Sequence, residues 1–222
     1  MKNSNVRKLA VLAMISALSF VAMFFFRFNV MFLTFDFKDA VMSIATLLYG
    51  PISGVCCTVV VAFLESVTIG DTGIYGLIMD ILSSCAFLIP CGIVYKYKRT
   101  FSGAIIAAIC SVISVVIVMG FANIFITPFY MGVKSADVIA MLPTVLLPFN
   151  LSKGLMNAAV MLLIYKPLTN ILRKTRLLPP ADKKYGYDKK SLWLVIISLV
   201  VLILTAVFLL VVMKGKFVLF GV

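Results

Sequence analysis

The sequence predicts an all-α integral membrane protein with a six-helix core and one additional transmembrane helix at its C-terminal end. Of its 222 residues, 63% are hydrophobic, and the mean hydropathy is +1.16. Soluble domains contain roughly 45–50% apolar residues. The charged residues lie mainly in short clusters between long apolar stretches. Because a spanning helix needs about 20 mostly apolar residues, these stretches indicate a bundle of membrane helices.

Seven apolar stretches predict the helices in order. They cover residues 9–26, 40–49, 52–68, 75–95, 101–124, 145–172 and 192–213. The second stretch is too short to cross a bilayer alone. It is followed by Gly50-Pro51, which ends one helix and places a proline in the first turn of the next. We therefore expect a short second helix, a tight turn and a longer third helix.

The Pro-rich, charged segment LLPPADKKYGYDKK has no apolar periodicity, so we interpret residues 177–190 as a cytoplasmic linker. It separates a substrate-binding membrane core at residues 1–176 from an extra transmembrane helix and short tail at residues 191–222. Basic clusters before the first stretch, at residues 96–99 and from residue 173 onward predict the cytoplasmic side. We expect a multi-pass protein of the cell membrane with a cytoplasmic N-terminus.

The composition argues against several functions. The sequence has no histidine, no G-x-x-x-x-G-K-[ST] phosphate loop and no G-x-S-x-G or H-E-x-x-H motif, so neither ATP hydrolysis nor His-dependent catalysis is expected. The five cysteines lack the paired spacing of a zinc site, and we expect no metal centre. The net charge of +12 comes from clusters that flank apolar stretches, which indicates membrane topology and not a nucleic-acid partner.

The stretch LLPFNLSKGLMNAAVMLL, at residues 146–163, carries a lysine within an apolar helix. Asn150, Lys153, Asn157 and Met161 recur at the three-and-four spacing of one helix face. A lysine near the bilayer centre costs about 2.5–3.5 kcal/mol on insertion scales, so it marks a functional site by default. Lys153 could instead snorkel to the headgroups. The two asparagines on its face favour a polar pocket.

Other polar residues fall in the outer halves of the neighbouring helices. Asn123 lies at a similar depth to Lys153, where it could contact a ligand or hydrogen-bond another helix. Asp80 lies on the fourth predicted helix, and we expect it to pair with Lys153. The short outer turn contributes Thr72 and Gly73, where backbone groups can approach a ligand closely.

Two further features suggest contact surfaces. The first outer loop, FFFRFNVMFLTFDFKDAV, is rich in phenylalanine, which forms either an interfacial belt or a cover that stacks on a flat ligand. Its Phe35 and Asp36 are candidate ligand-binding residues. On the first helix, Ala10, Ala13 and Ala17 lie close to one face, where small residues allow close approach of another helix. That helix could belong to this chain or to a partner.

Several strings, taken in order, resemble the substrate-binding S components of energy-coupling factor (ECF) vitamin transporters, most closely the riboflavin-specific RibU group. The strings are KLAVLAMISALSFV, FDFKDAV, LLYGPISG, IPCGIVYKYKRT, NIFITPFY and FNLSKGLMNAAVMLLIYKPL, within residues 7–174. The resemblance implies a six-helix protein whose first outer loop and helices four to six hold a vitamin taken from outside. It assigns ligand contacts to Asn123, Asn150 and Lys153.

The resemblance also implies partners. The alanine face with Ala13 and Ala17 would dock on a transmembrane coupling subunit that carries two cytoplasmic ATPases. Riboflavin or a related flavin would be the transported ligand, with no separate cofactor and no enzymatic activity in this chain.

Three alternatives stay open. Asp80 stands where riboflavin binders tend to carry asparagine, so the cargo could be a different vitamin. A membrane-embedded enzyme could use Glu65, Asp71 and Asp80 as acid and base, although no paired-carboxylate motif supports it. A stand-alone secondary transporter would be expected to show a second, repeated half, which is absent.

Overall fold

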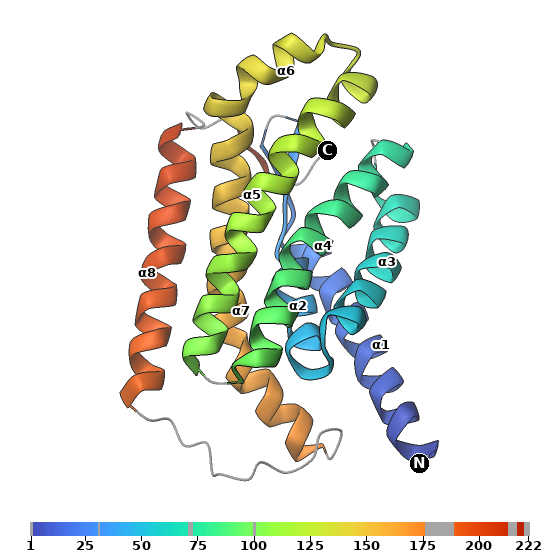
Figure 1. Cartoon of the computed structure of the whole chain (residues 1–222), viewed down its shortest axis with the longest axis vertical. Coiled ribbons are helices and arrows are strands. Elements are labelled where there is room, and N and C mark those ends of the chain that lie inside the picture. The colour runs from blue at the N-terminus through green and yellow to red at the C-terminus, as the bar shows by residue number, and fades with distance from the viewer. Residues whose placement is uncertain are drawn as a thin grey trace.

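The computed structural model describes residues 2–30, 32–70, 73–99, 101–175, 189–212 and 217–219, and these form a bundle of long helices with a small sheet at one end (Figure 1). The elements are α1 (Lys2–Phe25), β1 (Phe28–Val30), β2 (Leu33–Phe35), α2 (Lys38–Tyr49), α3 (Pro51–Thr68), α4 (Gly73–Tyr97), α5 (Phe101–Met131), α6 (Ser135–Met141), the π-helical turn η1 (Leu142–Leu146), α7 (Leu147–Lys174), α8 (Lys189–Val212) and β3 (Phe217–Leu219).

The predicted helical membrane fold is confirmed. Within the described residues, five helical segments are long and apolar enough to cross a membrane. They are Asn5–Phe25, Pro51–Thr68, Gly73–Tyr97, Ser102–Met131 and Ser135–Tyr165. The 12-residue α2 is too short, and α8 contributes the shorter apolar segment Val195–Phe208. The predicted count of six core helices plus one therefore stays a prediction, and most of the predicted linker, residues 177–188, lies outside the described residues.

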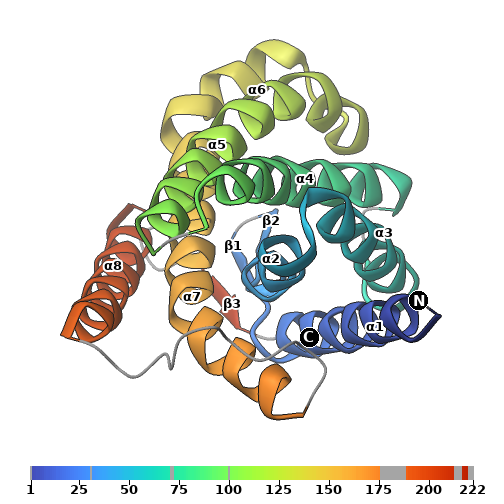
Figure 2. The same ribbon diagram turned by 60° about the horizontal axis from the view of Figure 1, so that its bottom comes forward.

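The short second helix and its turn form as expected. Gly50 takes a positive φ of 91°, which favours glycine, and Pro51 occupies the first turn of α3. The turn lets α2 return into the middle of the bundle, where it lies between α1, α3, α4 and α7 (Figure 2). The residues of α2 from Lys38 to Leu47 are all buried. The charged start of α2 is thereby held inside the protein.

Small residues allow the helices around α2 to pack closely. A methyl group added at Gly92 of α4 would lie 2.9 Å from the Pro51 backbone. At Gly154 of α7 the nearest atom of Val112 would be 3.4 Å from such a methyl group. These close approaches hold α4 against the start of α3 and α7 against α5.

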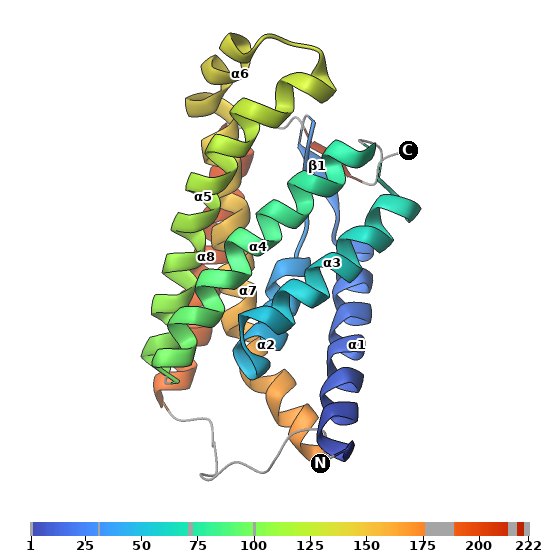
Figure 3. The ribbon, with the colours of Figure 1, turned by 45° about the vertical axis from the view of Figure 1, so that its right-hand side comes forward.

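That sheet was not predicted. The first loop folds as an antiparallel hairpin in which Phe28 pairs with Phe35 and Asn29 pairs with Thr34. β3 joins on the other side of β1, so the strand order is β2-β1-β3. The hairpin, the end of α3, the start of α4 and α6 lie at the same end of the bundle, opposite the N-terminus (Figures 1 and 3). We call this the hairpin end.

Candidate ligand-binding site

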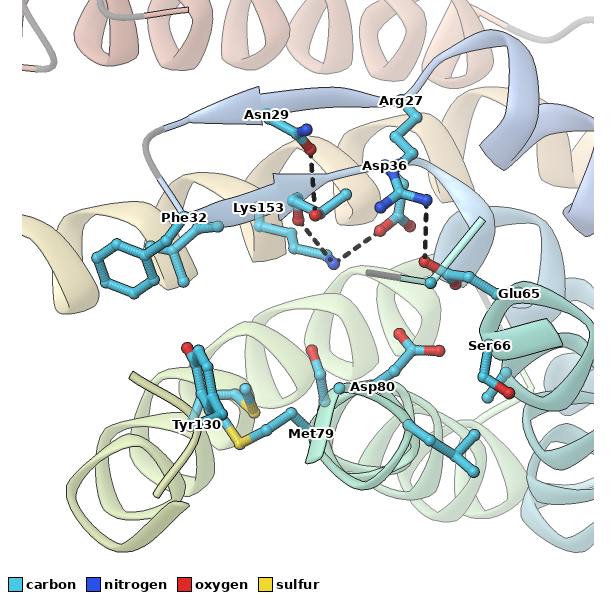
Figure 4. Close-up of a pocket in the computed structure, with 18 of the residues that line it drawn as sticks. Arg27, Asn29, Phe32, Asp36, Glu65, Ser66, Met79, Asp80, Tyr130 and Lys153 are labelled. Carbon is cyan, nitrogen blue, oxygen red and sulfur yellow. Dashed lines mark hydrogen bonds and ion pairs between the residues drawn. The ribbon is translucent and has the colours of Figure 1, made fainter. Parts of the chain in front are cut away.

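A cavity of about 350 Å³ lies at the hairpin end. It falls within the roughly 300–1,000 Å³ range of small-molecule sites. Its walls come from the hairpin, α3, α4, α5 and α7, which are far apart in sequence (Figure 4). The polar and aromatic lining residues include Arg27, Asn29, Phe32, Thr34, Asp36, Glu65, Asp80, Asn123, Tyr130, Asn150 and Lys153.

Lys153 points from α7 towards the hairpin. Its Nζ donates to Asp36 Oδ2 at 2.8 Å and to the Thr34 carbonyl at 3.4 Å (Figure 4). Only 10% of the Lys153 side chain and 1% of the Asp36 side chain are exposed. A lysine that snorkels to the lipid headgroups would expose its ammonium group, whereas the Lys153 ammonium is paired with Asp36, so snorkelling is excluded. The face of α7 that carries Asn150, Lys153 and Asn157 thus points into the protein.

The Asp36 carboxylate is the counterion of Lys153. Burial alone would raise the pKa of Asp36, but the charges of Lys153 and Lys38 lower it to about 2. The backbone N–H of Lys38 also donates to Asp36 Oδ1 at 3.2 Å. Asp36 therefore stays ionised at neutral pH and holds Lys153 beside the cavity.

A second buried lysine, Lys38, was missed in the sequence and joins three elements. Its Nζ contacts Asp80 at 2.5 Å and also forms an ion pair with Glu65. Its side chain is 1% exposed. The signal was present in FDFKDAV, where a lysine between two aspartates starts a short apolar helix. Lys38 ties the start of α2 to α3 and α4.

The predicted pairing of Asp80 with Lys153 is wrong. Asp80 pairs with Lys38, and Lys153 pairs with Asp36. The reason is that the segment from β2 to α2 enters between α4 and α7 and brings its own two charges. Asp80 Oδ2 faces the cavity wall without a hydrogen-bond partner in the described part of the chain.

Asn123 and Asn150 also line the cavity, and both are buried. Asn123 donates to the Met119 carbonyl at 2.6 Å and accepts from Thr127 at 2.9 Å. Asn150 donates to the Leu146 carbonyl at 2.8 Å. Each amide keeps donor or acceptor capacity beyond these bonds within its own helix. They are positioned to offer it to a ligand.

Two predicted ligand contacts, Phe35 and Asn157, do not line the cavity. Neighbouring residues of a strand point to opposite faces, so Thr34 faces the cavity and Phe35 lies behind the sheet. Phe35 is fully buried and stacks on Phe28, with ring centroids 4.6 Å apart. Asn157 donates to the Asp36 carbonyl and accepts from the Ala40 N–H, both at 2.9 Å. Both residues support the cavity wall.

The edge of the cavity carries further residues. Arg27 lies 3.8 Å from Glu65 and donates to the Ile69 carbonyl at 3.2 Å. Gly73 lines the cavity with a φ of 59°, whereas Thr72 lies outside the described residues. Figure 4 shows Phe32 and Tyr130 at one end of the cavity, on opposite walls. These two aromatic residues were not singled out in the sequence.

The arrangement suits binding more than catalysis. Glu65 and Asp80, two of the three carboxylates that the enzyme alternative would use, each form an ion pair with Lys38. The third, Asp71, lies outside the described residues. Among the described residues, no group of three or more Cys, Asp or Glu could hold a metal ion. The cavity combines oriented amides, charges that neutralise one another and aromatic rings, which are features of small-molecule sites.

The alanine face of α1 is open to the surroundings. Ala10, Ala13 and Ala17 are exposed, while Val11 and Ile15 face the core. Within the described part of the chain, no other helix covers these three alanines. The face remains available to a partner.

Known proteins share this architecture. The family described as "ECF transporter, substrate-specific component" matches residues 7–165. The riboflavin transporter RibU of Staphylococcus aureus is 31% identical over 179 residues, which cover 76% of this chain and 93% of that protein. The riboflavin transporter FmnP of Bacillus subtilis is 27% identical, with coverage of 78% and 97%. Both likenesses extend over nearly the whole relative.

A solved structure agrees with the sequence relatives. It is described as "Structure and mechanism of the S component of a bacterial ECF transporter", and it is 29% identical. The likeness covers 76% of this chain and 99% of that one, with a TM-score of 0.65. The matched family, the sequence relatives and the shared fold lead to one conclusion: this chain belongs to the substrate-specific S components of ECF transporters.

Proposed function

We propose that this chain captures riboflavin, or a closely related flavin, as the substrate-binding subunit of an ATP-driven importer. The observation that carries the proposal is the cavity at the hairpin end, in a chain that matches two riboflavin transporters along most of their length. A membrane protein of this family needs a site for its cargo. The cavity at the hairpin end has the size and the polar lining that such a site requires.

The chemistry of the lining suits a flavin. The aromatic side chains of Phe32 and Tyr130, on opposite walls of the cavity (Figure 4), would stack on a flat tricyclic ring. The amides of Asn123 and Asn150 and the Lys153 ammonium supply hydrogen bonds for ring carbonyls. The free oxygen of Asp80 can accept from a ribityl hydroxyl or a ring N–H.

The same proposal includes orientation and partners. Arg7 and Lys8 lie near the start of α1, and Lys96 and Lys98 lie at the end of α4. Both helix ends lie opposite the cavity (Figure 1), which supports a cytoplasmic N-terminus and a cavity facing outward. The exposed alanine face of α1 would contact a transmembrane coupling subunit. Two cytoplasmic ATPases on that subunit would supply the nucleotide chemistry that this chain lacks.

We also retain the division of the chain as part of the proposal. Residues 1–176 would form the substrate-binding core, residues 177–190 a linker, and residues 191–222 an accessory helix with its tail. The family match ends at residue 165, before α8 begins, which supports treating α8 as an addition to the core.

The test is a titration of the purified chain in lipid nanodiscs with riboflavin, followed by quenching of flavin fluorescence. We expect saturable binding at one flavin per chain, with thiamine and biotin as non-competing controls. Competition by another vitamin, or no flavin binding by folded protein, would overturn the riboflavin assignment. A different vitamin stays the alternative cargo, because Asp80 stands where riboflavin binders tend to carry asparagine.

A further inference from the structure

We propose that the C-terminal segment formed by α8 and β3 holds the hairpin wall of the cavity in place and thereby slows release of the bound ligand. β3 pairs with β1 as a third antiparallel strand, with Asn29 opposite Val218 and Phe28 opposite Leu219. The role of β3 is to position the wall, and the effect on ligand release rests on the proposed function.

β1 forms part of the cavity wall. Asn29 of β1 and Thr34 of β2 both line it, and Thr34 accepts from Lys153 through its carbonyl. Asp36, the counterion of Lys153, directly follows β2. A shift of this hairpin would therefore move the wall and the ion pair together.

The hairpin is short for independent stability. It contains three residue pairs, and an isolated two-stranded hairpin is marginally stable at best in water. Without β3, β1 would present an unpaired backbone edge. The third strand converts β1 from an edge strand into the central strand of the sheet.

α8 has the length and position to deliver β3 to this end. Its 24 residues rise about 36 Å, slightly more than the hydrocarbon thickness of about 30 Å. It runs along α7 and ends at the hairpin end (Figures 1 and 2). α7 ends at the end of the bundle opposite the hairpin, and α8 brings the chain back to the hairpin end.

α8 also packs against the base of the hairpin. Ser198, Leu202 and Thr205 lie on one face, and Leu202 joins the apolar cluster of Phe35 and Phe149 behind the sheet. The opposite side of α8 is apolar and exposed, as expected for contact with lipid. α8 lies away from α1, so the alanine face stays open (Figure 2). The segment can therefore support the wall without covering that face.

The experiment compares full-length protein in nanodiscs with three variants. Deletion of residues 217–222 removes β3, and Val218→Pro removes one backbone N–H from the strand. Val218→Thr is the matched control, because threonine keeps the backbone donor and favours strands. Circular dichroism and ligand-free thermal unfolding verify that each variant retains the helical core.

Two readouts are taken. The riboflavin dissociation rate is measured by stopped-flow displacement, and hydrogen exchange is measured at the backbone amides of β1. In the deletion we expect dissociation about fivefold faster, on the scale of lost cross-strand pairs, with faster exchange in β1. Val218→Pro should shift both readouts in the same direction, and Val218→Thr should match the full-length protein.

An unchanged dissociation rate in the folded deletion variant would overturn the proposal. If the full-length protein does not bind riboflavin either, the proposed function fails, and hydrogen exchange alone decides whether β3 holds β1. Equal exchange of β1 in the full-length and deleted chains would then overturn the positioning role as well.

Discussion

The ion pair between Lys153 and Asp36 should serve both the fold and the ligand, and a double-mutant cycle can separate the two roles. The variants are Lys153→Met, Asp36→Asn and the combination of both. In Lys153→Met the Asp36 carboxylate loses its bond of 2.8 Å and keeps the longer bond of 3.2 Å from the Lys38 backbone. A buried carboxylate is then only partly compensated.

The expected loss follows from this geometry. Breaking a fully buried pair costs about 3–5 kcal/mol, and an unsatisfied buried group costs about 1–3 kcal/mol. Because Lys153 borders the cavity and Asp36 retains one donor, we expect a loss of about 2–3 kcal/mol in the free energy of unfolding. Unfolding in mixed dodecyl sulfate micelles measures it. Lys98→Met, at an exposed site at the other end, is the control and should change little.

The double variant makes the test sharp. Replacing both partners removes the unpaired charge, so Lys153→Met/Asp36→Asn should regain at least half of the lost unfolding free energy. Riboflavin affinity should not recover, because a bond from a charged donor is worth about 1.5–3 kcal/mol, or tenfold and more in Kd. Wild-type affinity in the double variant would refute a ligand role for Lys153. Unchanged stability in both single variants would refute the structural role of the pair.

Three further outcomes are expected. Lys38→Met leaves the partly buried carboxylates of Glu65 and Asp80 without their shared cation. It should lower the thermal unfolding temperature of the ligand-free protein, and an unchanged temperature would contradict the network. Gly92→Ala forces a methyl group against Pro51 and should also lower the unfolding temperature. Gly120→Ala should not, because its methyl group would lie 3.6 Å from the nearest side chain, Leu147. Equal effects of the two variants would contradict the packing. Ala17→Leu should reduce co-purification with a coupling subunit while riboflavin binding persists. The control is Val200→Phe, which changes an exposed residue of α8. Full assembly of Ala17→Leu would argue against docking through α1.

The sequence was sufficient for the elements whose signals are local. Helix positions follow from apolar stretches, and Gly50-Pro51 marks the turn before α3 because both residues have restricted backbone roles. The inward direction of Lys153 follows from helical periodicity with its asparagines. These inferences need no knowledge of distant contacts.

The remaining features depend on tertiary contacts that no local pattern encodes. Phenylalanines in the first loop are compatible with an interfacial belt, and their strand pairing is decided by the cluster around Phe149. Two buried lysines, Lys38 and Lys153, lie in this part of the protein, and the path of the chain into α2 places Lys38 beside Asp80. The pairing of β3 with β1 joins residues far apart in the sequence, such as Phe28 and Leu219, which are 191 positions apart.

The most direct test of the account is a structure of this chain determined with riboflavin bound in a membrane mimetic. The account predicts the flavin ring in the cavity at the hairpin end, between Phe32 and Tyr130, with at least one of Asn123, Asn150 and Lys153 at hydrogen-bond distance. A flavin bound elsewhere, or one that leaves all three residues without ligand contact, would contradict it.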